Sequence, residues 1–327
     1  MHILVIGAAG MVGVKLVNRL CADGTVAVKA ITKLTRHDVV IAGAPPASSF
    51  PVETFASDLS TPGEAEKLVA SRPDLIFHLA AIVSGEAEAD FEKGYRINLD
   101  GTRYLFEAIR KVGDGYKPKV VFTSSIAVFG APFPDAIYDE FHLTPLTSYG
   151  TQKAISELLL ADYSRRGFFD GIALRFPTIC VRPGKPNLAA SGFFSGIIRE
   201  PLAGQEAVLP VGEDVRHWHA SPRAAIGFLL HAAGLDTAQL GARRSITLPG
   251  VSCTVGEQIA ALRRIAGDKV AARIRHQPND TIIRIVAGWP RNFDAKRGKA
   301  LGFEAETSFD DIIQVHIQDE LGGKFVK

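Results

Sequence analysis

Short β-branched runs alternate with longer amphipathic stretches over roughly the first 180 residues, and this alternation constrains the fold more than any other feature. The runs predict strands at residues 2–6, 34–40, 51–55, 75–79, 119–123 and 171–176. The stretches predict helices at residues 11–22, 62–71, 91–112 and 148–166. The second helix is expected to begin at Thr61 and Pro62, an N-cap followed by proline. This order predicts an α/β fold with a doubly wound parallel sheet.

The pattern changes after Arg182. Residues 182–187 contain two prolines and a glycine, which indicate a loop, and the remainder mixes short helical patterns with isolated strand candidates such as residues 245–248. We therefore expect a first domain over residues 1–181 and a smaller C-terminal substrate-binding part over residues 182–327, with some of its elements returning to the first domain. Ligands of open α/β sheets bind outside the carboxyl ends of the strands, where such additions collect.

The composition excludes several classes of function. With 37 Lys and Arg residues against 35 Asp and Glu residues, the net charge of +2 is too small to indicate nucleic-acid binding. No run of about 18 apolar residues occurs, so no membrane span is expected. Cys21, Cys180 and Cys253 have neither metal-ligand spacing nor the pattern of a disulfide framework. They fit thiols in a reducing cytoplasm, where we expect the protein to act.

A glycine-rich turn follows the first expected strand and opens the first helix. Gly7, Gly10 and Gly13 have the spacing GxxGxxG, and Met11 and Val12 begin the helix. In this context glycines let backbone N–H groups approach a pyrophosphate at the positive end of a helix. Any tight turn from strand to helix favours glycine, so the turn alone leaves a purely structural role open.

A carboxylate in the next strand strengthens the case for a dinucleotide. Asp38 ends the apparent second strand, 25 residues after Gly13. The usual offset is about 20 residues, at which a carboxylate accepts hydrogen bonds from ribose hydroxyls and repels a 2′-phosphate. The expected cofactor is therefore NAD rather than NADP. Arg36 and His37 would weaken this preference if they turned toward the adenosine.

Further cofactor contacts are expected after the third and fourth strands. Asp58 and Leu59 follow the third strand, and Leu79, Ala80 and Ala81 follow the fourth. Their short or small groups suit the lining of an adenine and a pyrophosphate. Each also has a structural interpretation, because Asp58 fits a turn before a helix and the two alanines fit close packing under the sheet.

The reacting group is expected on the helix over residues 148–166. Tyr149 and Lys153 are four residues apart, which places the phenol and the ammonium on one helix face. A phenol has a reference pKa of about 10, and a nearby lysine cation with an oxidised nicotinamide favours the phenolate, which can act as a base. Ser125, at the end of the fifth strand, is placed to hydrogen-bond the reacting oxygen. Alone, Tyr149 and Lys153 would more often be a surface pair, but their coincidence with the glycine turn and the serine favours catalysis.

Seven motifs together resemble those of the extended short-chain dehydrogenase/reductases. They are GAAGMVG, DL after the third strand, HLAA, YRINLDGT, FTSSIAVFG, YGTQK and LRFPT. The resemblance covers nearly the whole chain and implies a Rossmann fold, NAD, and a catalytic set of Ser125, Tyr149 and Lys153. It also implies that Asn98 supports the geometry of the cofactor and active site, and that Pro177 lies at the cofactor.

Four longer segments resemble members of that family that oxidise a small sugar acid: HLAAIVSGEAEADF, TSYGTQKAISELLL, RPGKPN and FFSGIIREPLAGQ. This resemblance implies NAD-dependent oxidation of a four-carbon aldonate at C2. Nucleotide-sugar epimerases often carry acidic residues in the segment that here reads RHWHASP, and the lack of those acids argues against such a substrate. An epimerase that retains its NAD and a non-catalytic NAD-sensing module on the same fold remain alternatives.

A sugar acid needs a cation for its carboxylate, and bidentate geometry favours arginine. The candidates are Arg182, Lys185, Arg199 and Arg216. We expect Arg216 to hold the carboxylate, with Arg182 as the second choice. Ser84 and Thr178 are expected to contact the substrate together with the catalytic serine and tyrosine. No metal ion is expected, because His217 and His219 lack a nearby third ligand.

The family resemblance also implies a homodimer. The long helix that contains Asn98 and the helix that begins near Tyr149 usually pair across a two-fold axis in such proteins. The apolar residues expected at that interface are Tyr104, Phe106, Leu158 and Leu159. The alternative is that some of them simply face their own sheet.

Overall fold

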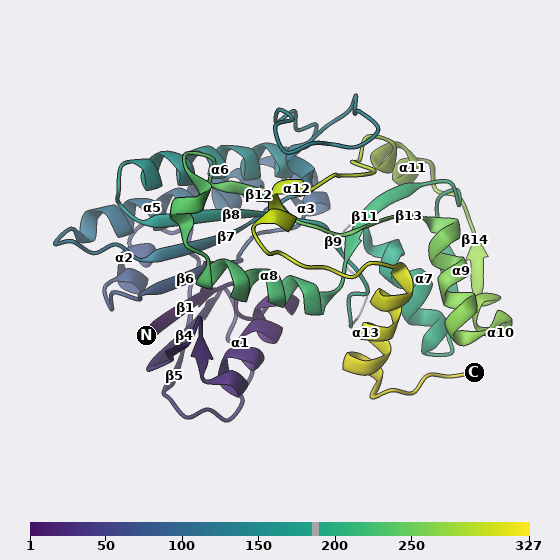
Figure 1. Ribbon diagram of the computed structural model, residues 1–327, viewed down its shortest axis with the longest axis horizontal. Coiled ribbons are helices and arrows are strands. Elements are labelled where there is room, and N and C mark those ends of the chain that lie inside the picture. The colour runs from purple at the N-terminus through teal and green to yellow at the C-terminus, as the bar shows by residue number, and fades with distance from the viewer. Residues whose placement is uncertain (185–189) are drawn as a thin grey trace. The chain divides into compact units, whose positions relative to one another are not determined.

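The computed structural model describes residues 1–184 and 190–327 (Figure 1). Contacts within the chain divide it into two compact units. The first unit comprises Met1–Val128, Thr147–Arg175 and Ile226–Ile246, and the second comprises Phe129–Leu146, Phe176–Ala225 and Thr247–Lys327. The chain thus alternates between the units, and the expected boundary after residue 181 stays a prediction.

A seven-stranded sheet forms the centre of the first unit. Its spatial order is β12 (Ser245–Thr247), β8 (Asp170–Phe176), β7 (Lys119–Ser125), β6 (Leu75–His78), β1 (His2–Ile6), β4 (Lys33–Asp38) and β5 (Val52–Ala56). The pairs from β7 through β5 are parallel. The chain proceeds outward from β1 first on one side and then on the other, which is the doubly wound topology that the sequence predicts. Ligands of such sheets bind at the carboxyl ends of the strands where the order reverses, here beside β1.

Helices cover both faces of this sheet. Figure 1 shows α2 (Glu64–Val69), α5 (Gly101–Val112) and α6 (Ser148–Arg165) on one face, with α1 (Met11–Asp23) and α8 (Pro222–Gly234) on the other. Because successive side chains of a strand point to opposite faces, Leu4 and Ile6 pack with Phe106 of α5, whereas Ile3 and Val5 face the other way. Burial on both faces explains why β1 is a continuous apolar run rather than an alternating one.

The short elements of the first unit connect these layers. They are the hairpin β2 (Thr25–Val26) and β3 (Lys29–Ala30), α3 (Ser84–Ala89), α4 (Phe91–Gly94), the π-helix η1 (Tyr95–Asp100), and the 3₁₀ turns η2 (Ile126–Val128) and η3 (Thr237–Leu240).

The six expected strands of the first part occur within two residues of their expected ends, but two expected helices differ. Helix α2 begins at Glu64 after Gly63, and Thr61 instead closes a turn in which its carbonyl accepts from the Glu64 N–H at 3.2 Å. The expected N-cap at Thr61 was therefore wrong. The helix expected over residues 91–112 is interrupted, because η1 separates α4 from α5.

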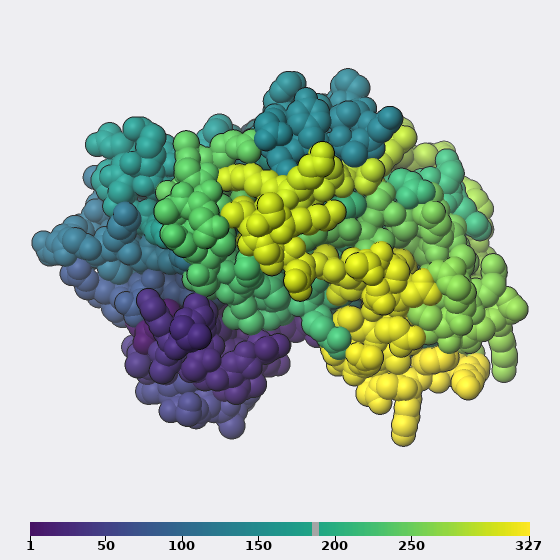
Figure 2. All heavy atoms as spheres, in the orientation of Figure 1, coloured from purple at the N-terminus to yellow at the C-terminus, as the bar shows by residue number. Residues whose placement is uncertain are grey.

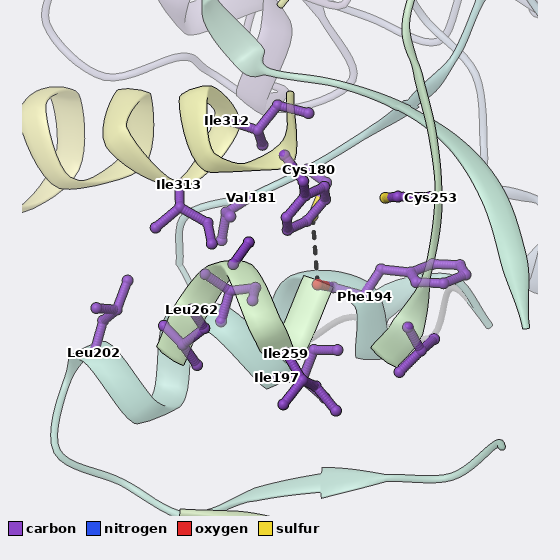
Figure 3. Packing of buried hydrophobic residues seen from close by; sticks show 14 of the residues in the cluster. Cys180, Val181, Phe194, Ile197, Leu202, Cys253, Ile259, Leu262, Ile312 and Ile313 are labelled. Carbon is purple, nitrogen blue, oxygen red and sulfur yellow. Dashed lines mark hydrogen bonds between the residues drawn. The ribbon is translucent and has the colours of Figure 1, made fainter. Parts of the chain in front are cut away.

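In its described residues, the second unit contains the three-stranded sheet β13-β11-β9 and four helices of eight or more residues. Its elements are β9 (Thr178–Ile179), α7 (Gly192–Leu202), β10 (Ala207–Leu209), β11 (Arg216–Ala220), β13 (Val251–Thr254), α9 (Val255–Ala266), α10 (Asp268–Ala271), β14 (Ile274–His276), α11 (Asp280–Ala287), α12 (Lys296–Ala300) and α13 (Phe309–Leu321). Short helices such as α10 and α12 occur as expected, but α7, α9 and α13 are longer and span 11 to 13 residues. An apolar core of 18 buried residues explains these lengths, because each helix buries one face in it (Figure 3).

The chain end follows α13 at the surface, as the yellow atoms in Figure 2 show. Across residues 1–184 and 190–327, no helix combines the length and the hydropathy that crossing a membrane requires.

Candidate active site

The glycine turn between β1 and α1 packs backbone against backbone. A Cβ on Gly13 would lie 2.1 Å from the Gly7 carbonyl oxygen, and a Cβ on Gly7, whose φ is +91°, would lie 2.7 Å from the Ala80 nitrogen. Packing therefore requires glycine at both positions. A Cβ on Gly10 would meet nothing nearer than the Gly7 oxygen at 3.5 Å, so packing within the chain does not require this glycine.

The N-terminus of α1 suits an anion. Gly10 provides no side-chain cap, and the first turn, which begins with Met11 and Val12, contains no acidic residue. The first amides of a helix have no partner within it, and the positive end of the helix dipole favours phosphate. The residues present therefore fit a dinucleotide pyrophosphate beside the carboxyl end of β1.

Asp38 lies against the glycine turn. Its Oδ2 accepts from the Ala9 N–H at 2.8 Å, and its Oδ1 accepts from the Val39 N–H at 2.7 Å. The side chain is only half-buried, so the carboxylate keeps a face toward solvent at the end of β4. This is the position from which a carboxylate can reach ribose hydroxyls.

Arg36 and His37 are buried within the unit rather than presented beside Asp38. The Arg36 guanidinium donates to the Thr54 Oγ1 at 2.6 Å and to the Gly43 carbonyl at 3.0 Å. The His37 Nε2 pairs with a serine hydroxyl at 3.0 Å, and burial lowers the pKa of this histidine, which keeps it neutral at pH 7. Neither side chain therefore offers a cation for a 2′-phosphate.

Asp58, after β5, has a structural role in its own turn. Its Oδ1 accepts from the Ser60 N–H at 2.9 Å, and its Oδ2 accepts from Arg96 at 2.6 Å. Burial alone would raise the pKa of Asp58, but the hydrogen bonds from Ser60 and Arg96 outweigh it and lower the pKa. The neighbouring Leu59 is buried in the apolar core of the first unit.

Leu79, Ala80 and Ala81 continue β6 at the same edge. The Leu79 N–H donates to the Ile6 carbonyl at 2.8 Å, and the Ala80 backbone is the surface that closes on Gly7. Close packing therefore explains the small residues here, and their contact with a cofactor stays a prediction.

Helix α6 brings Lys153 and Tyr149 to the carboxyl end of β7. The buried Lys153 Nζ donates to the Thr123 carbonyl at 2.7 Å, and it lies 4.5 Å from the ring centroid of Phe122 and 5.7 Å from that of Tyr149. The four-residue spacing thus places both side chains on one face of the helix. Ser125 ends the same strand, and its Oγ accepts from a backbone N–H at 3.1 Å.

The environment of Lys153 is unusual for a lysine, because the side chain is buried. Burial lowers the pKa of Lys153 to about 7, and the negative charge of Glu157, one turn further along α6, opposes this shift. Perturbed groups of this kind concentrate at functional sites.

A buried network fixes α6 below Lys153, and the sequence analysis missed it. Glu157 accepts from the Ser124 hydroxyl at 2.5 Å on β7 and from Arg175 on β8 at 2.8 and 3.0 Å. The available signal was a glutamate four residues after Lys153, which the helical period places on the same face.

Asn98 joins three elements from within the π-helix. Its Oδ1 accepts from the Ile82 N–H at 2.9 Å, and its Nδ2 donates to the Gln152 Oε1 at 2.8 Å. Asn98 thus connects the segment after β6 to α6. Its partner on α6, Gln152, directly precedes Lys153 in the sequence. A π-turn is common at functional sites, and hydrophobic periodicity gives no sign of one.

The arginines of the second unit differ in role. Arg182 donates to the Ile179 carbonyl at 3.0 Å and to the Ser191 hydroxyl at 3.3 Å, and Arg199 donates to the Arg182 carbonyl at 2.7 Å. Arg182 is thus bonded to the end of β9 and to the residue before α7, and Arg199 of α7 bonds back to Arg182. Lys185 lies outside the described residues.

Arg216 lines a cleft of about 640 Å³ in the second unit. Its guanidinium donates to the Ser252 carbonyl at 3.1 Å and pairs with Glu257 at 3.2 Å, and 38% of its side chain is exposed. Arg291 lines the same cleft, and the sequence analysis missed it because no motif surrounds it. Among the cation candidates, Arg216 thus lies on the wall of this cleft.

The remaining candidates have mixed surroundings. Ser84 begins α3 and is half-buried, Pro177 is buried, and the Thr178 Oγ1 pairs with the His217 Nε2 at 2.7 Å. His219 instead pairs with Gln258 at 2.9 Å. Both histidines are therefore hydrogen-bonded within the second unit.

The residues expected at a dimer interface differ in their exposure. Phe106 is fully buried in the core of the first unit and cannot contribute to an interface, so its inclusion was wrong. Leu158 on α6 is 67% exposed, and Tyr104 and Leu159 are half-buried.

Comparison with known proteins finds relatives over the whole chain. D-erythronate dehydrogenase of Cupriavidus necator is 46% identical over 324 residues, covering 98% of each chain. D-erythronate dehydrogenase of Haemophilus influenzae is 41% identical, covering 98% of this chain and all of that protein.

Among solved structures, one described as the nucleoside-diphosphate-sugar epimerase from Agrobacterium tumefaciens is 67% identical with a TM-score of 0.97, over 99% of this chain and 95% of that one. L-threonine dehydrogenase from Cupriavidus necator shares the fold, with a TM-score of 0.85 at 22% identity over 98% and 99% of the two chains. The model of the NAD dependent epimerase/dehydratase family matches residues 3–231. With this match and these relatives, the chain belongs to the NAD dependent epimerase/dehydratase family.

Proposed function

We propose that this chain is an NAD-dependent dehydrogenase that oxidises D-erythronate at C2 to 2-dehydro-D-erythronate. The observation that carries the proposal is the 46% and 41% identity, over nearly the full length, to two D-erythronate dehydrogenases. The arrangement of Tyr149 and Lys153 at the end of β7 supports oxidation of an alcohol.

In this reaction Tyr149 takes the proton of the C2 hydroxyl, and the Lys153 ammonium favours the phenolate form. Ser125 accepts a hydrogen bond from the Ala127 N–H, which leaves its own proton available to the reacting oxygen. When bound, NAD supplies the hydride acceptor at its nicotinamide C4. General-base catalysis of this kind contributes about 10²–10⁴-fold, and orientation supplies much of the remainder.

The cofactor in this proposal lies along the edge beside β1. Its contacts are Gly7, Gly10, Met11, Val12, Gly13, Asp38, Asp58, Leu59, Leu79, Ala80, Ala81, Asn98 and Pro177, with Tyr149 and Lys153 at the nicotinamide end. The substrate is held by Ser84, Ser125, Thr178 and one arginine.

The test is a spectroscopic screen for NADH formation with purified protein, NAD and four- to six-carbon sugar acids. We expect D-erythronate to give the highest kcat/KM. Absence of NADH formation with every sugar acid overturns the proposal.

A nucleotide-sugar epimerase is the second candidate, because the structure 67% identical to this chain is described as one. Such an enzyme returns the hydride, so NADH does not accumulate and a sugar nucleotide is isomerised instead. The segment from Arg216 to Pro222 contains no acidic residue, which favours the dehydrogenase.

Asp38→Ala is expected to narrow the preference for NAD over NADP at least tenfold, a change of about 1.4 kcal/mol, because the repulsion of the 2′-phosphate is lost. The measurement is kcat/KM with each cofactor. Asp23→Ala, which removes an exposed carboxylate at the other end of α1, is the matched control. An unchanged ratio in Asp38→Ala contradicts the assignment.

Arg216→Ala is expected to raise the KM for D-erythronate roughly ten- to hundredfold, because a charge-assisted bond of about 1.5–3 kcal/mol is lost. The KM for NAD should barely change. Arg263→Ala removes a cation of the same unit that pairs on the surface with Asp268 and serves as control. An unchanged KM, with the increase in Arg182→Ala instead, transfers the role to Arg182.

We also place the enzyme in the cytoplasm as a homodimer. All three cysteines are free and buried, which suits a reducing compartment.

The exposed Leu158 supports association of two chains through α6. Light scattering at micromolar concentration should give twice the chain mass for the wild type, falling toward one chain mass in Leu158→Glu. A monomeric wild type contradicts the dimer.

A further inference from the structure

Thr178 and His217 form a pair within the second unit that the reaction above does not explain. Thr178 begins β9 and His217 lies on β11, and the Thr178 Oγ1 is 2.7 Å from the His217 Nε2. The other ring nitrogen, Nδ1, lies 2.8 Å from the Pro290 carbonyl oxygen. The imidazole is buried and stacks on Phe194 with ring centroids 5.2 Å apart and planes 4° from parallel. Its orientation is therefore fixed.

The partners determine the tautomer of His217. A carbonyl oxygen only accepts hydrogen bonds, so Nδ1 carries the proton. Burial lowers the pKa of His217 to about 4, against a smaller opposing effect of the Pro290 carbonyl, so the ring is neutral at pH 7. Its Nε2 then has a lone pair and no proton, and the Thr178 hydroxyl must donate to it.

This assignment limits what the Thr178 hydroxyl can bind. Its one proton is committed to His217, and only lone pairs remain. Thr178 can therefore accept a hydrogen bond from a hydroxyl, whereas a carboxylate or keto oxygen facing it would find no proton. Thr178 is half-buried and follows β8 by two residues along the chain. Segments that follow the carboxyl ends of strands commonly supply ligand contacts in such sheets.

We propose that His217 is a positioning residue that holds Thr178 as a hydrogen-bond acceptor for the C3 or C4 hydroxyl of the sugar acid. The inference rests on the proposed function. With such an acceptor, the hydroxyl groups of the substrate contribute to specificity. This contribution is separate from the recognition of the carboxylate by an arginine.

The test combines enzyme variants with deoxy substrates. A lost neutral hydrogen bond should cost about 3- to 10-fold in kcat/KM, mainly through the KM for D-erythronate. We expect this loss in Thr178→Val and in His217→Phe, and no further loss in the double variant, because both remove one interaction. Thr178→Ser and His217→Gln, which keep a hydroxyl and an acceptor, should restore most of it.

The substrate arm identifies the hydroxyl. With the wild type, the 3-deoxy and 4-deoxy analogues should lose different amounts of kcat/KM relative to D-erythronate. The larger of these two losses should be smaller in Thr178→Val. The inference is overturned if the losses of kcat/KM in the two single variants add up in the double variant. It is also overturned if Thr178→Val leaves the loss of kcat/KM unchanged for both analogues.

His219→Phe is the matched control, because His219 is equally buried on β11 and contacts Phe194. Its backbone is the register partner of Thr178, but its side chain pairs with Gln258 and makes no bond to the Thr178 hydroxyl. It should leave the KM for D-erythronate unchanged. The same rise as in His217→Phe would show that packing of β11, rather than Thr178, is responsible.

The inference and the proposed function fail in different ways. Absence of NADH formation by the wild type defeats the proposed function. Nitrogen NMR of the histidine rings tests the geometry without any substrate: we expect a protonated Nδ1 and an unprotonated Nε2 in His217, with the Nε2 resonance shifted in Thr178→Val. A protonated Nε2 overturns the inference even in an active enzyme.

Discussion

Tyr149→Phe is expected to lower kcat for D-erythronate at least a hundredfold, or about 2.7 kcal/mol, because the general base is lost while the ring remains. The phenyl ring still fills its place over Lys153, which lies 5.7 Å from the ring centroid of Tyr149. The affinity for NAD should therefore change little. Steady-state kinetics of NADH formation and direct titration of NAD measure the two quantities separately.

The control for this variant is on the same helix. Tyr163 of α6 donates its hydroxyl to Glu107 of α5, away from the end of β7, so Tyr163→Phe removes an equivalent hydroxyl without touching the proposed chemistry. Its kcat should stay within a few-fold of the wild type. Equal turnover in Tyr149→Phe and Tyr163→Phe would refute the assignment of the base.

Glu157→Gln is expected to lower the free energy of unfolding by about 3–5 kcal/mol, the usual cost of leaving one partner of a buried ion pair without the other. Glu157 is 2% exposed and Arg175 is 8% exposed, so water cannot solvate the Arg175 guanidinium once the carboxylate charge is lost. Denaturant titration followed by circular dichroism measures the change.

Asp162→Asn is the control for this second variant. It breaks an ion pair with Arg165 on the same helix, but both side chains are more than half exposed. Exposed pairs contribute about 0–1 kcal/mol, so the loss should be small. Similar losses in the two variants would show that burial of the Glu157–Arg175 pair does not determine its contribution.

The sequence predicted those parts of the site that depend on neighbours in the chain. Gly7 and Gly13 were identifiable because a turn from strand to helix requires close backbone approach within a few residues. Tyr149 and Lys153 were placed on one face by the helical period alone. Asp38 was found by its distance from the turn along the chain, and the structure brings its carboxylate to the Ala9 N–H.

Other features depend on contacts that no local pattern encodes. Hydrophobic periodicity predicted one helix over residues 91–112, but Asn98 bonds to Ile82 and Gln152 within a π-turn that interrupts it. Arg182 was a candidate for a substrate carboxylate, and its guanidinium donates to the Ile179 carbonyl of β9 and to the Ser191 hydroxyl before α7.

The sequence by itself determined the order of strands and helices, the glycine turn and the spacing of Tyr149 and Lys153, because periodicity and backbone sterics act over a few residues. Only the tertiary structure decided which distant polar groups meet, as Glu157 does with Arg175 and Thr178 with His217, 39 residues away. A buried polar group must find a partner, but any of several positions in the chain can supply it. The packing of the core selects one, and that selection is a property of the whole fold.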